Sequence, residues 1–332
     1  MKVCVGIIGL GKIGHRFGIS PQGDPLSHSE GYAQIPNVTV VLGVDPDPEA
    51  CRNFQQRFSE AQVYSSLKDV PHGLHLDVVS VCSPTHLHAQ GVIAALAWRS
   101  RVILCEKPLA INAAEAEMML AACSAQGCIL ITNYSRRWTP MLQALKNLTN
   151  QDDGLGTPIG ACLRYNGGLL HNGTHWIDML LALFGSVACT YRLEKLSVAQ
   201  DDAGESIALS WNSGLTAYLI AVRGTGYSIG EGELWGTGGM LRYSAGGQQV
   251  TWQTVQPSQW SGFQELSQAK MICEAGLKGH ILGAVTEAVQ LAQMGGQPTC
   301  SGSDGVLALQ VVEMARNNKF LQDLRTQIPQ PP

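Results

Sequence analysis

The sequence predicts an α/β protein in which a doubly wound parallel sheet is followed by an α+β domain with an open, mostly antiparallel sheet. Its 332 residues suffice for about two domains of roughly 150 residues. The first third alternates short β-branched runs with helical patterns, which is typical of a parallel sheet covered by helices. After Asn133 strand-like runs follow one another directly. We therefore expect domains over 1–133 and 134–326, and a polar, proline-rich tail over 327–332.

The first domain is expected to contain six parallel strands and the helices that connect them. Continuous Val- and Ile-rich runs predict the strands, because a parallel sheet is buried on both faces. The predicted strands are 3–8, 38–44, 63–64, 77–82, 101–105 and 128–132. The predicted helices begin at 13 or cover 48–58, 86–98 and 113–126.

Seven strand-like runs predict the sheet of the second domain. They are 160–165, 188–195, 205–212, 215–222, 231–236, 240–244 and 249–255. The segments 212–214 (Asn-Ser-Gly) and 245–247 (Ala-Gly-Gly) are turn signals that would join their neighbours as antiparallel hairpins. Helices are expected over 140–148, 174–183, 272–294 and 303–320, which gives an open sheet with helices on one side.

Composition excludes several classes of function. The net charge is -4, from 22 basic and 26 acidic side chains, and the basic residues are scattered, so neither nucleic acid nor a membrane surface is an expected partner. No apolar run reaches the eighteen or more residues of a membrane helix. The ten cysteines form no CxxC pair and most lie in apolar runs, which favours reduced core residues of a cytoplasmic protein. Scattered histidines predict no metal site.

A glycine-rich motif follows the first predicted strand and opens a helix: Gly9-Leu-Gly11-Lys12-Ile13-Gly14. Glycines in this pattern allow a tight turn, close approach of the backbone to a pyrophosphate and close packing of helix on strand, and the helix N-terminus favours the anion. We therefore expect this segment to bind a dinucleotide. A glycine-rich turn that binds no ligand is the alternative.

Asp45 ends the second predicted strand, where an acidic residue would bind the adenosine ribose hydroxyls. It lies 31 residues after Gly14, against about 20 in the usual fingerprint, and the segment 18–30 is interpreted as an inserted loop that accounts for the excess. Because an aspartate disfavours a 2′-phosphate and no Arg or Lys follows before Arg52, we expect NAD in preference to NADP. The alternative is that Asp45 or Asp47 only caps the next helix.

Further polar residues are expected near the same cleft. Lys107, in Cys-Glu-Lys-Pro, directly follows a buried strand at the carboxyl edge of the sheet, where open α/β folds bind ligands. Pro108 restricts its backbone to an extended conformation. An arginine and aromatic rings after the last parallel strand suit a polar, hydroxylated or carboxylated ligand. The expected substrate contacts from these segments and from the second domain are Tyr134, Arg137, Trp138, Arg164 and His171.

These motifs resemble those of the glucose-fructose oxidoreductase and inositol dehydrogenase family (Gfo/Idh/MocA). The matching segments occur in the expected order over almost the whole chain, at 9–14, 78–88, 106–108, 133–138 and 173–178. The resemblance implies a Rossmann-like domain, a nicotinamide cofactor, and hydride transfer at a sugar, cyclitol or related carbon. It also implies a homodimer or homotetramer formed through the open sheet.

Position by position, the resemblance implies that Lys107 hydrogen-bonds the reacting oxygen and stabilises its developing charge. It implies that His175 is the general acid or base. We expect the two side chains to converge over one face of the bound pyridine ring. The resemblance assigns further cofactor contacts to Ser83, Pro84, Thr85, His88 and Glu106.

Position 171 departs from the family pattern. Many members have an aspartate four residues before the histidine, where it assists the lysine and orients the substrate, and this chain has His171. A histidine supplies no permanent anion, so either the pH dependence differs or another group, Asn172 or Asp178, takes the role. This departure leaves open the alternative of a catalytically inactive nicotinamide-binding sensor. A reductase of a non-sugar substrate also stays open, because substrate choice depends on side chains of the second sheet, whose register the sequence does not fix.

Overall fold

The computed structural model describes residues 2–150, 154–196, 202, 204–223 and 226–318. These residues form two compact units, which are described separately below. The first comprises Met1–Trp138 and Gly279–Leu307, and the second comprises Thr139–Lys278 and Ala308–Pro332. The expected tail, 327–332, lies outside the described residues.

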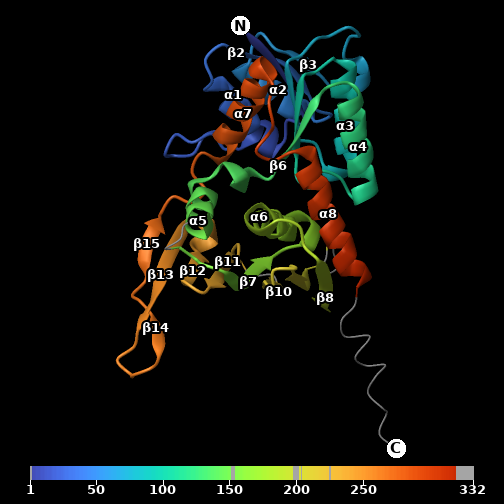
Figure 1. The fold of residues 1–332 in the computed structure, drawn as a ribbon. Coiled ribbons are helices and arrows are strands. Elements are labelled where there is room, and N and C mark those ends of the chain that lie inside the picture. Colours follow the sequence, from blue (N-terminus) through green and yellow to red (C-terminus); the bar gives the residue numbers. More distant parts are fainter. Residues whose placement is uncertain (1, 151–153, 197–201, 203, 224–225, 319–332) are drawn as a thin grey trace, which may run out of the picture. The chain divides into compact units, whose positions relative to one another are not determined.

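The first unit contains a six-stranded parallel sheet in the order β3-β2-β1-β4-β5-β6 (Figure 1). The strands are β1 (Val3–Ile8), β2 (Val38–Val44), β3 (Gln62–Tyr64), β4 (Val78–Val81), β5 (Val102–Glu106) and β6 (Ile129–Asn133). Every residue of β4 and β5 is buried, as the Val- and Ile-rich runs predict. Because all six strands run in one direction, their carboxyl ends meet at one edge of the sheet.

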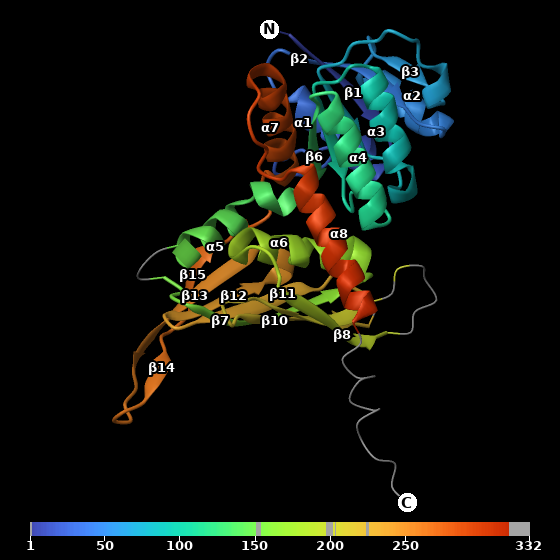
Figure 2. The same ribbon diagram turned by 45° about the vertical axis from the view of Figure 1, so that its right-hand side comes forward.

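Helices cover both faces of this sheet, which confirms the doubly wound arrangement. Figures 1 and 2 show α1 and α7 together on one face and α3 and α4 together on the other. The helices are α1 (His28–Ala33), α2 (Pro48–Arg57), α3 (His88–Ala97), α4 (Ala113–Ala125) and α7 (His280–Met294). The glycine motif opens only a short π-helical turn, Lys12–Arg16, and α1 begins at His28, inside the segment interpreted as an inserted loop.

Helix α7 belongs to the first unit, although the sequence analysis grouped residues 134–326 together. Its apolar side, which includes Ile281, Val285 and Val289, is buried in the same core as Val5 of β1. The helix also begins later than predicted. Gly279 precedes it with a φ of 70°, and part of the expected 272–294 helix is instead strand, Lys270–Cys273.

The second unit contains a nine-stranded sheet in the order β14-β13-β12-β11-β7-β10-β9-β8, with β15 also paired to β13. Among the described strands of this sheet, only β7 and β10 pair in parallel, so the predicted open, mostly antiparallel sheet is confirmed. Both predicted hairpins, β9–β10 and β12–β13, form. The strands are β7 (Pro158–Asn166), β8 (Cys189–Lys195), β9 (Glu205–Ser210), β10 (Thr216–Val222), β11 (Gly230–Gly236), β12 (Gly239–Ser244), β13 (Gln249–Pro257), β14 (Gln264–Leu266) and β15 (Lys270–Cys273).

Helices of the second unit lie along one face of its sheet (Figure 2). They are α5 (Pro140–Asn150), α6 (Thr174–Phe184) and the second half of α8 (Gly302–Asn317). Trp176 and Leu180 of α6 are almost fully buried, so this helix supplies part of the core above the sheet. Within the described ranges, no helix is both long enough and apolar enough to cross a bilayer.

Candidate functional site

The glycine motif forms a tight loop between β1 and the first helical turn. Gly9 has a φ of 89°, and a Cβ there would lie 2.5 Å from the backbone nitrogen of Ser83. A Cβ at Gly14 would overlap the carbonyl oxygen of Gly9. A Cβ at Gly11 would have no atom within 4 Å, so this backbone faces open space that a ligand can approach. The backbone at the three glycines therefore has the geometry that a tight turn, close ligand approach and helix packing require.

A cavity of about 590 Å³ lies beside this loop, within the size range of small-molecule and cofactor sites. Five of the predicted cofactor residues line it, namely Gly9, Gly11, Asp45, Ser83 and Pro84. The sequence analysis missed the others, which are Ile8, Val44, Pro46, Ser65, Ser66, Leu67, Cys82, Leu87 and Gln90. Ser65 and Ser66 directly follow β3, so the rule that ligands bind at the carboxyl ends of parallel strands was a signal that could have found them.

Asp45 connects the end of β2 to the glycine loop. Its carboxylate accepts the backbone N–H of Leu10 at 2.6 Å and that of Asp47 at 2.8 Å. The cap of α2 is Asp47, which accepts the N–H of Glu49 at 2.9 Å, so Asp45 is not merely a helix cap. An ionised carboxylate has about four acceptor positions, and two hydrogen bonds leave capacity for ribose hydroxyls.

The remaining predicted cofactor residues are not among those that line the cavity. Lys12 is exposed, Ile13 packs against the core and Thr85 is partly exposed. His88 is 1% exposed, and its ring nitrogens lie 2.8 Å from the carbonyl oxygen of Ser83 and 3.0 Å from that of Pro108. Burial lowers the pKa of His88, although these carbonyl groups favour its charged form. His88 therefore ties the loop after β4 to the loop after β5.

Glu106 is the centre of a buried polar network at the end of β5. Its Oε1 accepts hydrogen bonds from His28 Nε2 at 2.9 Å and Asn133 Nδ2 at 2.6 Å. On the other side of His28, Nδ1 lies 2.9 Å from the hydroxyl of Ser80, which is also 2.9 Å from that of Tyr32. Burial would raise the pKa of Glu106, but the hydrogen bonds and charge of His28, the Asn133 amide and the Lys107 charge lower it. The carboxylate is therefore ionised at neutral pH.

Lys107 follows this carboxylate directly and is half-buried. Its backbone N–H donates to Oε2 of Glu106 at 3.2 Å, and its peptide bond to Pro108 is cis. The position at the carboxyl end of β5 is the one predicted. Glu106 thus holds the backbone that carries the lysine.

Three predicted substrate residues of the first unit make contacts within it. Tyr134 is fully buried. The Arg137 guanidinium lies 3.1 Å from the carboxylate of Asp304, and its side chain is 7% exposed. Trp138 Nε1 donates to Glu287 of α7 at 2.8 Å. These contacts hold the segment after β6 against α7 and the start of α8.

The second unit places the other predicted residues around β7 and α6. Arg164 of β7 forms an exposed ion pair with Glu231 at 3.6 Å. Asn172 donates its amide to the carbonyl oxygen of Asn166 at 2.8 Å, and His175 is half-buried in the first turn of α6.

The carboxylate beside His171 is neither of the groups that the sequence suggested. Asn172 has an amide, and Asp178 is 1% exposed inside α6. Instead, Asp202 lies 2.8 Å from His171 Nδ1. No local sequence signal predicts this contact, because the two residues are 31 positions apart.

Comparison with known proteins identifies the first unit. Residues 3–134 match the oxidoreductase family with the NAD-binding Rossmann fold, Gfo/Idh/MocA. The match covers 132 of the 332 residues. The resemblance that the motifs carry is therefore confirmed.

Two curated relatives are sugar or cyclitol dehydrogenases. The chain is 26% identical over 214 residues to the D-apiose dehydrogenase of Paraburkholderia graminis, a match that covers 58% of this chain and 56% of that protein. It is 27% identical over 154 residues to the myo-inositol 2-dehydrogenase of Thermotoga maritima, covering 46% and 42%. The chain thus spans about half the length of these relatives.

A solved structure supports the fold of the whole chain. The UDP-N-acetylglucosamine 3-dehydrogenase of Acidithiobacillus ferrooxidans is similar with a TM-score of 0.78 and 16% identity, over 96% of this chain and 98% of that one. At this identity the similarity shows the fold alone.

The first unit's geometry fits a nicotinamide dinucleotide. The backbone at Gly11 is open to a ligand, the cavity adjoins it, and the Asp45 carboxylate stands at the cavity wall. In the described part of the chain, no group of three His, Cys, Asp or Glu side chains could hold a metal ion.

Proposed function

We propose that this protein is an NAD-dependent oxidoreductase that transfers a hydride between nicotinamide and a carbon of a sugar, sugar derivative or cyclitol. The observation that carries the proposal is the cavity formed by the glycine loop, Asp45 and the loop after β4. The family match and the two dehydrogenase relatives support the same reaction class.

The preference for NAD over NADP rests on Asp45. Its carboxylate would accept hydrogen bonds from the ribose hydroxyls and would repel a 2′-phosphate. The residues that line the cavity include no Lys or Arg that could neutralise that phosphate. We expect the dissociation constant of NAD to be at least about tenfold lower than that of NADP, which corresponds to about 1.4 kcal/mol. Equal affinity would contradict the preference.

Two side chains are proposed to act on the reacting substrate oxygen, one by stabilising its charge and the other by transferring its proton. In the oxidation direction, the Lys107 ammonium hydrogen-bonds the substrate oxygen and stabilises its developing negative charge. His175 accepts the hydroxyl proton as the carbon–hydrogen bond breaks, and returns it in the reverse direction. Bound nicotinamide supplies the hydride acceptor. The Glu106 carboxylate, through the Lys107 N–H, fixes the backbone from which the ammonium extends.

Replacing Lys107 with Ala tests the proposal. Because Lys107 acts on the substrate oxygen, Lys107→Ala is expected to abolish turnover and to leave NAD affinity within about twofold. The measurements are NAD binding by calorimetry and NAD reduction with a panel of polyols, aldoses and nucleotide sugars. Equal turnover in the variant would remove Lys107 from the reaction. Tight NAD binding without wild-type turnover on any compound would favour an inactive sensor.

A further inference from the structure

Two cysteines of the first unit meet where α4 ends and β6 begins. Cys123 lies in the last turn of α4, and Cys128 directly precedes β6. Both are free thiols. The sequence analysis grouped them with the other reduced core cysteines, because four residues separate them and they form no CxxC pair. Their proximity follows from the way in which the helix ends.

The backbone closes α4 with a turn that brings the chain back to the helix. Gly127 has a φ of 66°, a left-handed conformation that suits glycine, and its N–H donates to the carbonyl oxygen of Ser124 at 3.1 Å. The N–H of Cys128 donates to the carbonyl oxygen of Cys123 at 2.9 Å. These two hydrogen bonds form a Schellman motif, in which the side chains at the positions of Cys123 and Cys128 often contact each other.

The same hydrogen bond limits the distance between the two cysteines. Because the nitrogen of Cys128 lies 2.9 Å from the oxygen of Cys123, standard backbone dimensions keep their α-carbons within about 6.8 Å of each other. Disulfides join residues whose α-carbons are about 4.4–6.8 Å apart. The side chains also face each other, since a hydrogen bond joins the two thiol groups. The backbone thus permits a disulfide between them.

The pair is enclosed but is connected by an exposed turn. Cys123 is 0% exposed and Cys128 is 7% exposed. The four residues between them are all exposed. Because helix ends fray, local opening of this turn gives a small oxidant access to the sulfurs without unfolding of the unit.

The hydrogen bond between the thiols also favours reaction. It lowers the pKa of Cys123, although burial opposes this shift. The thiolate is the form of cysteine that attacks a disulfide. By contrast, burial raises the pKa of Cys82 and Cys105, and the charge of Glu106 adds to the shift. These two buried cysteines of the same unit are expected to stay inert.

We propose that Cys123 and Cys128 form a redox-sensitive dithiol, a modification site at which a small disulfide such as oxidised glutathione produces an intramolecular disulfide. One cysteine thiolate attacks the small disulfide, breaks its S–S bond, releases one thiolate and leaves a mixed disulfide. The other cysteine attacks the protein sulfur of that mixed disulfide, so the Cys123–Cys128 bond forms and the second thiolate leaves. The two protein protons pass to the released thiolates, so two cysteines are oxidised and one small disulfide is reduced.

The new bond would fasten the end of α4 to the start of β6. Because β6 and β1 run in the same direction, Cys128 lies at the opposite edge of the sheet from the glycine loop. Neither cysteine lines the cavity beside that loop. The modification therefore acts on stability and does not depend on the proposed function.

Peptide mapping of the native protein tests the proposal. Cleavage after Lys, Arg and Glu yields the peptide 118–136, whose only cysteines are Cys123 and Cys128. After incubation with oxidised glutathione, this peptide should lose the mass of two hydrogen atoms, and dithiothreitol should restore it. Because the cross-link restricts the unfolded chain, the oxidised protein should unfold at a higher urea concentration than the reduced protein.

Three variants complete the experiment. Cys128→Ala and Cys123→Ala cannot close the bond and should lose both the mass change and the urea shift. Cys273→Ser, at a half-buried cysteine of β15, is the matched control and should keep both. A peptide 118–136 that retains two thiols would overturn the proposal, as would oxidation only at urea concentrations that unfold the protein. An equal urea shift in Cys128→Ala would also overturn it.

Discussion

Each unit contains a histidine–carboxylate pair among its described residues, and the two pairs differ in burial. His28 lies 2.9 Å from Glu106 in the first unit, and His171 lies 2.8 Å from Asp202 in the second. The His28 side chain is 0% exposed and the His171 side chain is 52% exposed. The buried pair can act only on the protein around it, whereas the exposed pair can also meet a ligand. The same pair chemistry is therefore shielded from solvent in the first unit and open to it in the second.

The groups around the two pairs also differ in charge and exposure. Neutral groups, the Asn133 amide and the Ser80 hydroxyl, complete the hydrogen bonding of the buried pair. The exposed pair is completed by backbone N–H groups and the Arg316 guanidinium, which is 34% exposed. Water screens the second set more strongly, so its contribution to stability should be smaller.

The largest effect is expected from Glu106→Ala. It leaves the buried His28 ring and the Asn133 amide without their acceptor, and should lower the free energy of unfolding by about 3–5 kcal/mol. Glu106→Gln keeps one acceptor oxygen and should cost only about 1–2 kcal/mol. Urea unfolding at neutral pH measures both values. Equal costs for the two variants would show that the network does not depend on this acceptor.

A smaller effect is expected from Arg316→Met. The variant removes the link between Asp202 and Glu205 but leaves Arg192 paired with Glu205, whose side chain is 2% exposed. We expect a loss of about 1–2 kcal/mol. In Arg192→Met combined with Arg316→Met, Glu205 would lose both cations, so the double variant should cost more than the sum of the singles. Additive losses would mean that the cations do not share this carboxylate.

The cavity beside the glycine loop was predictable, because the sequence signals for its residues are local. Gly9, Gly11 and Gly14 directly follow one strand, and Asp45 ends the next. Because the carboxyl ends of parallel strands meet at one edge of the sheet, the sequence predicts that these residues lie close together. The same logic extends to Ser65 and Ser66, which the sequence analysis did not include. Strands of the second sheet were also predictable, except β14 and β15, whose mostly exposed residues give no alternating pattern.

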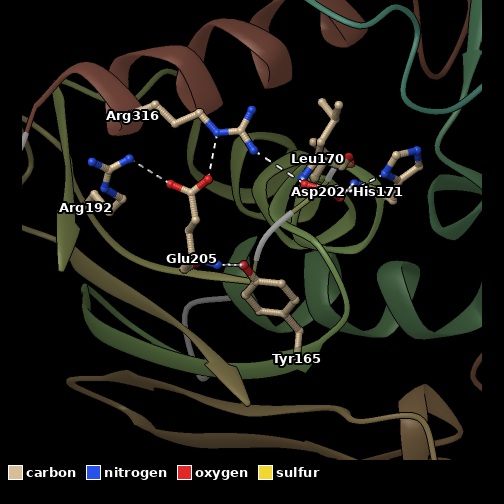
Figure 3. Close-up of polar contacts among 8 residues, drawn as sticks. Tyr165, Leu170, His171, Arg192, Asp202, Glu205 and Arg316 are labelled. Atoms are coloured by element: carbon tan, nitrogen blue, oxygen red, sulfur yellow. Dashed lines mark hydrogen bonds and ion pairs between the residues drawn. The ribbon is translucent and has the colours of Figure 1, made fainter. Parts of the chain in front are cut away.

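The cluster of His171, Asp202 and Arg316 was not predictable, because only tertiary contacts bring these residues together (Figure 3). Asp202 meets His171 only after the chain has passed through α6, β8 and the segment that follows. Arg316 reaches both carboxylates from the last helix. The packing of α7 on the first sheet was not predictable for the same reason. An apolar helix face shows that the helix is buried, but it does not show which sheet the helix packs against.

The pH dependence of stability distinguishes the contribution of Asp202. Its pKa is lowered in the folded protein, so the unfolded chain binds more protons in acid, and the stabilisation is complete above the unfolded pKa of about 3.9. It is lost as pH falls through the folded pKa. Urea unfolding between about pH 3 and 6 should therefore show a flatter pH dependence in Asp202→Asn than in the wild type. Parallel curves would contradict an ionised, stabilised Asp202.

The smallest effect is expected from an exposed pair that serves as the baseline for this comparison. Arg242 and Glu233 face each other across β12 and β11 at 2.9 Å, with side chains 55% and 29% exposed. Solvent screens this pair, so Glu233→Gln should change the free energy of unfolding by less than about 0.5 kcal/mol, and added salt should remove the difference. A loss as large as that of Arg316→Met would mean that exposure does not rank these ion pairs, and the contrast between the two histidine pairs would then need another cause.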